Sequence, residues 1–240
     1  MNWMPAPSTV RWMYPAIMGV AVVTAFALSR RRQKSLPLGR WERLGIGLGA
    51  FCGAMIGAKL PFVLADWEGF KSGAAWLDNG KTIVFGLAGG YFGVEIAKWA
   101  LEIRIKTGDS FAVPVAVAVG IGRLACFCAG CCQGAFTSLP WGVNFGDGPR
   151  HPTQLYETVF HLLAALGLHR LEAQGRCRGQ LIKLYIMVYL VYRFATEFIR
   201  PEPRLWLTLT GYQWACLGLV PVFILLWMRD QRSGAETHPA

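Results

Sequence analysis

The chain has 240 residues, of which 54% are hydrophobic and only 16% are charged, whereas a soluble domain carries about 25% charged residues. Too few polar side chains remain to cover a soluble surface, and the same composition excludes a disordered or collagen-like chain. The net charge of +10 does not indicate a nucleic-acid partner, because the basic residues lie in short clusters between long apolar runs. This pattern is typical of an integral membrane protein, in which Lys and Arg gather on the cytoplasmic loops.

Seven apolar segments approach the length of about 20 residues that an α-helix needs to cross a bilayer. In chain order they are 13–29, 44–65, 82–101, 110–129, 153–168, 180–198 and 209–228. The first is followed at once by Arg30, Arg31 and Arg32. A cleaved signal peptide carries its positive charge before the apolar run, so the first segment is predicted to be a retained span with the N-terminus outside.

The loop charges agree with that orientation. With the N-terminus outside, the predicted cytoplasmic segments hold fifteen Lys and Arg residues and the outer segments hold six. The cytoplasmic side of a membrane protein carries the excess of positive charge. We therefore predict an all-α, polytopic membrane helix bundle with seven transmembrane helices, N-out and C-in, over residues 1–229. Residues 230–240 are predicted to form a cytoplasmic tail.

Glycines recur every four residues in the second segment, at Gly45, Gly49, Gly53 and Gly57, and the third segment repeats the spacing. Glycines at this spacing line one helix face and allow a neighbouring backbone to approach closely. The pattern predicts close helix packing.

Polar residues inside the apolar segments are candidates for function, because an ionised side chain in hydrocarbon costs several kcal/mol unless it is paired or hydrated. Arg123 lies near the outer end of the fourth segment, and its planar guanidinium suits a phosphate or a carboxylate. The alternative is a structural ion pair with Glu95 or Glu197.

Two further polar patterns lie at the same predicted depth. The run 150–157 (Arg-His-Pro-Thr-Gln-Leu-Tyr-Glu) opens the fifth segment, where Gln154, Glu157 and His161 share one helix face. The alternative is a helix cap with an interfacial tyrosine. In the sixth segment, a polar stripe is predicted to face the bundle interior, unless its Arg and Glu only neutralise one another. Its members are Tyr189, Arg193, Glu197 and Arg200.

Four of the seven cysteines lie within seven residues: Cys126, Cys128, Cys131 and Cys132. Soft thiolates at this density could hold a thiophilic metal ion, with His151 as an extra ligand, or form a disulfide. The alternative is that small residues pack a tight helix end. The scattered Cys52, Cys177 and Cys216 are predicted to be packing residues.

Together, three strings resemble the signature of the prolipoprotein diacylglyceryl transferases. They are Gly122-Arg123-Leu124 with Phe127, Gly130 and Gly134; His151-Pro152-Thr153-Gln154-Leu155-Tyr156-Glu157; and Tyr189-x3-Arg193-Phe194-x2-Glu197-Phe198-x-Arg200. Val10-Arg11-Trp12 and Thr210-Gly211-x-Gln213 resemble weaker family motifs. The resemblance covers most of the chain in the right order. Known members of this family are seven-span inner-membrane enzymes with the N-terminus outside.

This resemblance implies transfer of the diacylglyceryl group of phosphatidylglycerol to the lipobox cysteine of a preprolipoprotein signal peptide, with release of glycerol phosphate, at the bacterial cytoplasmic (inner) membrane. Catalytic roles are implied for Arg123 and Arg193, which would hold the phosphate, and for His151 and Glu157. Substrate contacts are predicted for Tyr189, Glu197, Arg200, Gln154, Tyr156 and Gly134. No cofactor and no nucleic-acid partner are expected.

The chain departs from the family pattern at two places. Cys126 and Ala129-Gly130-Cys131 replace asparagine-containing motifs, and Val84-Phe85-Gly86-Leu87 replaces a His-Gly-Gly-Leu motif. In the family the histidine of that motif is important for activity. Here His151, Glu157 or the cationic field alone would activate the thiol, or the chemistry has changed. Two alternatives to the transferase follow: a membrane protein that uses the four clustered cysteines for a thiophilic metal or redox work, and a catalytically inactive relative.

Overall fold

The computed structural model describes residues 7–76 and 80–236, which are mostly helical. Its long helices, in chain order, are α1 (Pro7–Gln33), α2 (Arg40–Ala65), α4 (Ile83–Ala100), α5 (Asp109–Cys128), α6 (Thr153–Ala173), α7 (Leu181–Thr196) and α8 (Gly211–Glu236). The short elements are α3 (Trp67–Ser72), the 3-10 turns η1 (Ala74–Trp76), η2 (Glu197–Ile199) and η3 (Trp206–Thr208), and the strands β1 (Val143–Asn144) and β2 (Pro149–Arg150). The two strands pair antiparallel, with Val143 opposite Arg150.

Each of the seven predicted segments lies within or along one long helix. The boundaries differ at both ends of the chain. The predicted span 13–29 extends on each side within α1, and α8 continues to Glu236, eight residues beyond the predicted end of the last span. The first residues of the predicted tail therefore continue a helix, and residues 237–240 lie outside the described part of the chain.

Four stretches of these helices are long and apolar enough to cross a membrane: Trp12–Gln33, Arg40–Ala65, Asp109–Cys128 and Gly211–Arg232. Large apolar side chains also lie on the outside of the bundle. Phe26 of α1, Leu163 of α6 and Leu225 of α8 are each more than 60% exposed. A soluble protein rarely leaves such side chains over a wide surface, so the chain has the helices and the surface of a membrane protein.

The glycine prediction is confirmed at the contact between α2 and α4. Gly53 and Gly89 face each other across this contact, and a Cβ atom on either would collide with the backbone carbonyl oxygen of the other. Gly49 and Gly93 meet in the same way one turn further along. The two helices therefore pack backbone against backbone, a contact we call the glycine interface.

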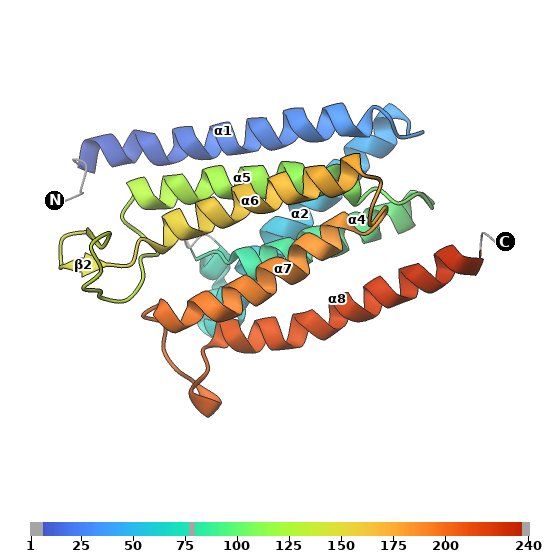
Figure 1. The fold of residues 1–240 in the computed structure, drawn as a ribbon. Helices are drawn as coiled ribbons and strands as arrows, with labels where there is room; N and C mark the ends of the chain where they lie inside the picture. Colours follow the sequence, from blue (N-terminus) through green and yellow to red (C-terminus); the bar gives the residue numbers. More distant parts are fainter. Residues whose placement is uncertain (1–6, 77–79, 237–240) are drawn as a thin grey trace.

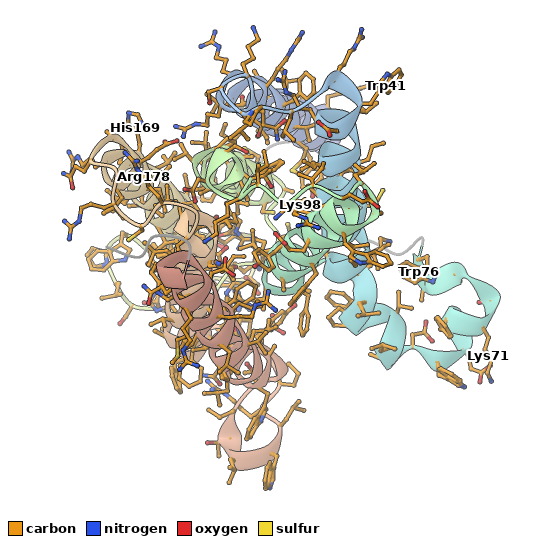
Figure 2. All side chains as sticks on the ribbon, turned by 90° about the vertical axis from the view of Figure 1, so that its right-hand side faces the viewer. Trp41, Lys71, Trp76, Lys98, His169 and Arg178 are labelled. Atoms are coloured by element: carbon orange, nitrogen blue, oxygen red, sulfur yellow. The ribbon has the colours of Figure 1, made fainter. Side chains whose placement is uncertain are left out.

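The long helices run alternately up and down the bundle (Figure 1). α5 and α7 end, and α6 and α8 begin, at the end of the bundle where α1 starts and where the β1–β2 hairpin lies. Figure 2 views the molecule from the opposite end, where the exposed side chains of Trp41, His169 and Arg178 lie at the edge of the bundle. In the same view α3, which follows the other end of α2 and carries Lys71, stands away from the bundle. The polar residues at the end of α5, at the start of α6 and at the end of α7 therefore lie at the same end of the molecule, beside the β1–β2 hairpin.

Candidate functional site

The carboxylate of Glu157, in the second turn of α6, is surrounded by three arginines. Its Oε2 lies 2.7 Å from Nε of Arg123 on α5. Its Oε1 lies 3.2 Å from Nη1 of Arg193, in the last turn of α7, and also accepts a hydrogen bond from Nη2 of Arg200. Three separate segments are therefore joined through one buried carboxylate.

A second carboxylate extends this arrangement. Glu197 Oε2 lies 2.8 Å from Nη2 of Arg193, one helical turn away. Its other oxygen accepts a hydrogen bond of 2.9 Å from the hydroxyl of Thr210, at the start of α8. The Arg193 guanidinium also lies over the ring of Tyr212, 4.5 Å from its centroid. We call Arg123, Glu157, Arg193, Glu197 and Arg200 the charged cluster.

The charged cluster is buried and is not neutral. Its five side chains are at most 8% exposed, and three guanidiniums face two carboxylates. Within the described residues, Nη2 of Arg123 and Nε of Arg200 are buried without a hydrogen-bond partner. A buried positive charge with free N–H donors is stabilised by an anion, and a phosphate suits the fork of a guanidinium.

The structure tests both alternatives for these arginines. The proposed pairing of Arg123 with Glu95 or Glu197 is wrong: its partner is Glu157, because α6 packs along α5, while Glu95 contacts Lys98 at 3.0 Å. The prediction that the stripe of the sixth segment faces inward is confirmed, since its four members are at most 7% exposed. The i,i+4 pair of Arg193 and Glu197 is also present.

Gln154 and Thr153, both buried at the start of α6, hold the segment that follows α5. The Gln154 side-chain amide donates to the carbonyl of Cys131 at 2.5 Å, and the Thr153 hydroxyl donates to the carbonyl of Cys132 at 2.8 Å. His161, on the same helix face, instead contacts the Tyr185 hydroxyl at 2.9 Å. The face predicted for α6 therefore has two uses, loop support and core contact.

Gly134 lies where two backbone segments meet. Its N–H donates to the carbonyl of His151 at 2.8 Å, and a Cβ atom at this position would come within 2.7 Å of the His151 side chain and 2.8 Å of the Ile199 carbonyl. Only glycine fits this approach without displacement of its neighbours.

His151 and Tyr156 lie at the edge of this region and contact each other, with 3.3 Å between the His151 Nδ1 atom and the Tyr156 hydroxyl. Trp141 also donates to that hydroxyl, at 2.8 Å. In the described part of the chain, the polar contacts of His151 thus lead to Tyr156 rather than to the arginines.

Arg150 fixes the hairpin beside the site. It donates to both carboxylate oxygens of Asp147, at 3.0 and 2.5 Å, and its guanidinium lies 3.8 Å from the centroid of the Phe136 ring. The Arg150 guanidinium also lowers the pKa of the exposed Asp147 carboxyl below its ordinary value, through this hydrogen bond.

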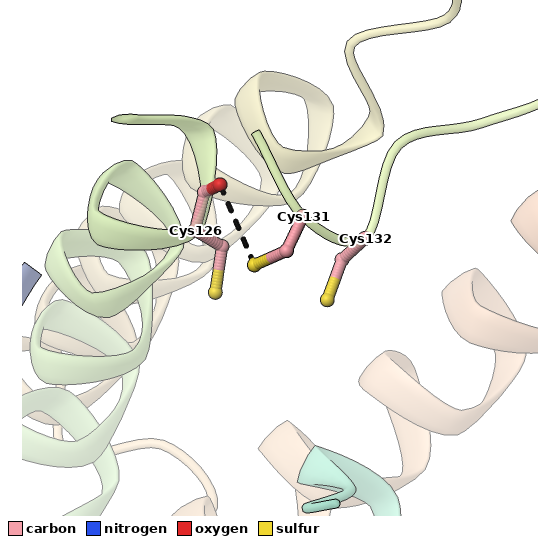
Figure 3. Close-up of side chains that lie close together, drawn as sticks. All are labelled: Cys126, Cys131 and Cys132. Carbon is pink, nitrogen blue, oxygen red and sulfur yellow. Dashed lines mark hydrogen bonds between the residues drawn. The ribbon is translucent and has the colours of Figure 1, made fainter. Parts of the chain in front are cut away.

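Three of the four clustered cysteines converge. The Sγ atoms of Cys126, Cys131 and Cys132 all lie within 4.8 Å of one another, a group we call the thiol cluster. Figure 3 shows Cys126 near the end of α5 and the other two on the segment that follows, with their sulfur atoms on the same side. Neither Cys128 nor His151 belongs to this group; Cys128 is two helix positions from Cys126 and so points to another face.

Sequence reasoning missed the part played by Thr153, which fixes Cys132. A threonine at a helix start is ordinarily read as a cap, and only its distant partner distinguishes this use. Thr210 and its neighbour Gln213, whose side-chain oxygen accepts from the Thr210 N–H at 2.9 Å, were visible only as a weak motif.

The sequence model of a family described as prolipoprotein diacylglyceryl transferase matches residues 3–229. The chain belongs to this family. It is 30% identical over 205 residues to the phosphatidylglycerol–prolipoprotein diacylglyceryl transferase of Clostridium tetani, covering 80% of this chain and 81% of the relative. It is 31% identical over 242 residues to the phosphatidylglycerol–prolipoprotein diacylglyceryl transferase of Nitratidesulfovibrio vulgaris strain Hildenborough, covering 92% of this chain and 90% of the relative. No solved structure matches the chain significantly.

Proposed function

We propose that this chain transfers the diacylglyceryl group of phosphatidylglycerol to the cysteine thiol in the lipobox of a prolipoprotein signal peptide. The observation that carries the proposal is the charged cluster, with its excess positive charge and free guanidinium donors, in a member of this family. Phosphatidylglycerol brings a phosphodiester with a single negative charge, which balances the single excess positive charge of the cluster.

The reaction forms a bond between the thiol sulfur and a glyceryl carbon, and it breaks the bond from that carbon to the phosphate oxygen. The electron pair leaves with glycerol phosphate, so negative charge increases at the phosphate as the reaction proceeds. Arg123 and Arg193 are fixed donors in a buried setting, where such charge stabilisation is strongest. We assign them to the phosphate, with Arg200 as a third cation.

Glu157 acts as the counter-ion of these arginines. A carboxylate in contact with three guanidiniums is stabilised as an anion, which makes it a poor acceptor for the thiol proton. Its task in the proposed site is to hold the three guanidiniums together. Glu197 holds Arg193 and Gln154 holds the Cys131 carbonyl beside the site, while Tyr189 is buried in the same bundle. We assign His151, Tyr156 and Gly134 to the outer edge of the site, near the acceptor peptide.

We place this site at the outer face of the bacterial inner membrane, in a seven-span bundle with N-out and C-in topology over residues 1–229 and a cytoplasmic tail from residue 230. The loop charges and the alternating helix directions support this topology. With a rise of about 1.5 Å per residue, Arg123 would lie about 7 Å inside the outer end of α5. That is the depth of a lipid phosphate or just below it.

The test uses membranes that contain the protein, phosphatidylglycerol and a peptide with a lipobox cysteine. Mass spectrometry should detect the added diacylglyceryl mass on the peptide sulfur. Arg123→Ala and Arg193→Ala should each lower the rate about 100-fold or more, the usual effect of losing a donor to transition-state charge. Arg178→Ala, at the opposite end of the bundle and exposed, is the matched control and should react like the wild type.

Two results would contradict the proposal. Adduct formation at the wild-type rate in both arginine variants would remove the charged cluster from the chemistry. No adduct with well-folded wild-type protein, beside an active enzyme of the same family, would instead identify a catalytically inactive relative.

A further inference from the structure

The thiol cluster is outside the charged cluster but touches it. Nη1 of Arg123 donates to the Sγ atom of Cys126, 3.7 Å away. Cys126 is half-buried, and Cys131 and Cys132 are exposed. The described cysteines are all free thiols, so the cluster is available as a set of three sulfur ligands.

The spacing of these sulfurs fits a metal ion. Zinc binds cysteine sulfur at about 2.3 Å, which places neighbouring ligand sulfurs about 4 Å apart. The three Sγ atoms are already within 4.8 Å of one another, so rotation of the side chains, with little backbone movement, would complete the site. Cys131 and Cys132 are adjacent in sequence, and Cys126 precedes Cys131 by five residues (Figure 3).

The backbone that carries the cluster is held in place. The carbonyls of Cys131 and Cys132 accept hydrogen bonds from the buried Gln154 and Thr153, and the N–H of Cys131 donates to the carbonyl of Cys126 at 3.1 Å. Cys132 has φ of 60°, a left-handed conformation that residues with a Cβ rarely adopt. Unusual backbone conformations of this kind persist where the surroundings impose them, and they gather at functional sites.

Charge also favours a metal here. Three thiolates and one Zn²⁺ carry one net negative charge. The guanidinium of Arg123 donates to the Sγ atom of Cys126 and would stabilise the thiolate form of that ligand.

We propose that Cys126, Cys131 and Cys132 bind one zinc ion and leave its fourth position to the thiol of the acceptor peptide. Three protein ligands with one open position are the pattern of catalytic zinc, and a thiol that coordinates the ion is deprotonated. This inference rests on the proposed function and supplies it with a way to form thiolate.

The step balances without any change of oxidation state. The acceptor thiol gives its proton to solvent when it binds the ion. Its sulfur then bonds to the glyceryl carbon, the bond from that carbon to the phosphate oxygen breaks, and the electron pair leaves with glycerol phosphate beside Arg123. The thioether product carries no charge and is a weaker ligand than the thiolate, so it leaves the ion.

The test begins with the reduced, metal-free full-length protein in detergent, titrated with Co²⁺ as a spectroscopic substitute for zinc. One equivalent should bind, with the intense near-ultraviolet absorption of cobalt–thiolate bonds. Cys126→Ser, Cys131→Ser and Cys132→Ser should each weaken binding more than about tenfold, because loss of a direct ligand costs at least as much as loss of an outer-shell partner, about 10–100-fold. Cys128→Ser is the matched control, since Cys128 is outside the cluster, and it should bind normally.

Addition of the lipobox peptide should then change the cobalt spectrum as a further thiolate binds, whereas the same peptide with serine in place of cysteine should not. In the transfer assay, removal of metal with a chelator should slow the wild type about 100-fold, and one equivalent of Zn²⁺ should restore the rate. This part uses the wild-type chain, so it does not depend on how the variants fold.

The outcomes separate the two proposals. Transfer that depends on Arg123 but is unaffected by metal removal, or the absence of stoichiometric cobalt binding, would overturn the zinc site and leave the transferase standing. Cobalt binding with a response to the thiol peptide, but no transfer beside an active control enzyme, would support the zinc–thiol site and overturn the transferase.

Discussion

Two contacts in this molecule hold helices together in opposite ways, one through backbone packing and the other through buried charges. At the glycine interface, α2 and α4 approach until the backbones touch, with no side chain between them. At the charged cluster, α5, α6 and α7 are joined by buried guanidiniums and carboxylates. Burial of apolar surface does not drive helices together in lipid, so close packing and polar contacts must do so.

The difference between the two contacts distinguishes structure from function. The glycine interface is favourable from van der Waals packing alone and needs no other partner. The charged cluster requires desolvation of five ionic groups, which can exceed the gain from pairing them, and it retains an excess charge. A contact of that kind stabilises helix packing only weakly, whereas its excess positive charge favours the binding of an anion.

The largest effect is expected from Glu157→Gln, which leaves three guanidiniums around a neutral amide. Removing one partner of a buried ion pair costs about 3–5 kcal/mol, so the melting temperature of the protein in detergent should fall steeply and transfer should be lost. Glu68→Gln removes the carboxylate of the exposed Lys71–Glu68 pair and should change neither quantity. Equal melting temperatures for the two variants would show that Glu157 is not the counter-ion of three buried guanidiniums.

A smaller effect is expected at the glycine interface. Gly53→Ala forces a methyl group against the backbone of Gly89, and overpacking of this kind costs about 1–3 kcal/mol. Transfer per folded molecule should stay unchanged, since the charged cluster is elsewhere. Gly47→Ala is the control, because a Cβ atom there meets open space. If the two alanine variants have the same melting temperature, the close contact of α2 and α4 would be refuted.

A smaller effect again is expected from the hydrogen bonds that hold the segment with Cys131 and Cys132. Gln154→Ala removes the hydrogen bond to the Cys131 carbonyl, worth about 1 kcal/mol. We expect a loss of about fivefold in transfer and in cobalt affinity together, with a melting temperature lowered by only about 2–4 °C. A melting temperature as low as that of Glu157→Gln would mean that Gln154 is part of the structural core instead.

The smallest effect is expected at the hairpin. Asp147→Asn weakens the exposed pair with Arg150, and exposed pairs contribute little, so transfer should change by about twofold or less. The pKa of Asp147 is lowered, so the pair is fully formed above the ordinary pKa of a carboxyl and is lost as pH falls through the lowered value. Any difference between variant and wild type in proteolysis of the hairpin should therefore vanish in acid, and a difference that grows in acid would contradict the assignment.

The sequence was sufficient for the helices and for the identity of the polar residues. Apolar runs predicted the seven long helices of the described residues, and the four-residue glycine spacing predicted the packing of α2 against α4. These features depend on local periodicity, which a single sequence displays. The three polar strings were recognised in the same way, as ionic groups where an apolar segment does not tolerate them unpaired.

Only the tertiary structure decided which of these residues meet. The choice of Glu157 as the partner of Arg123 depends on how α5 and α6 are aligned, and the exclusion of Cys128 from the thiol cluster depends on the direction of one side chain. A sequence fixes which residues lie on one face of one helix, because the helical period is constant. The pairing of faces between helices depends on packing over the whole bundle, which no local pattern contains.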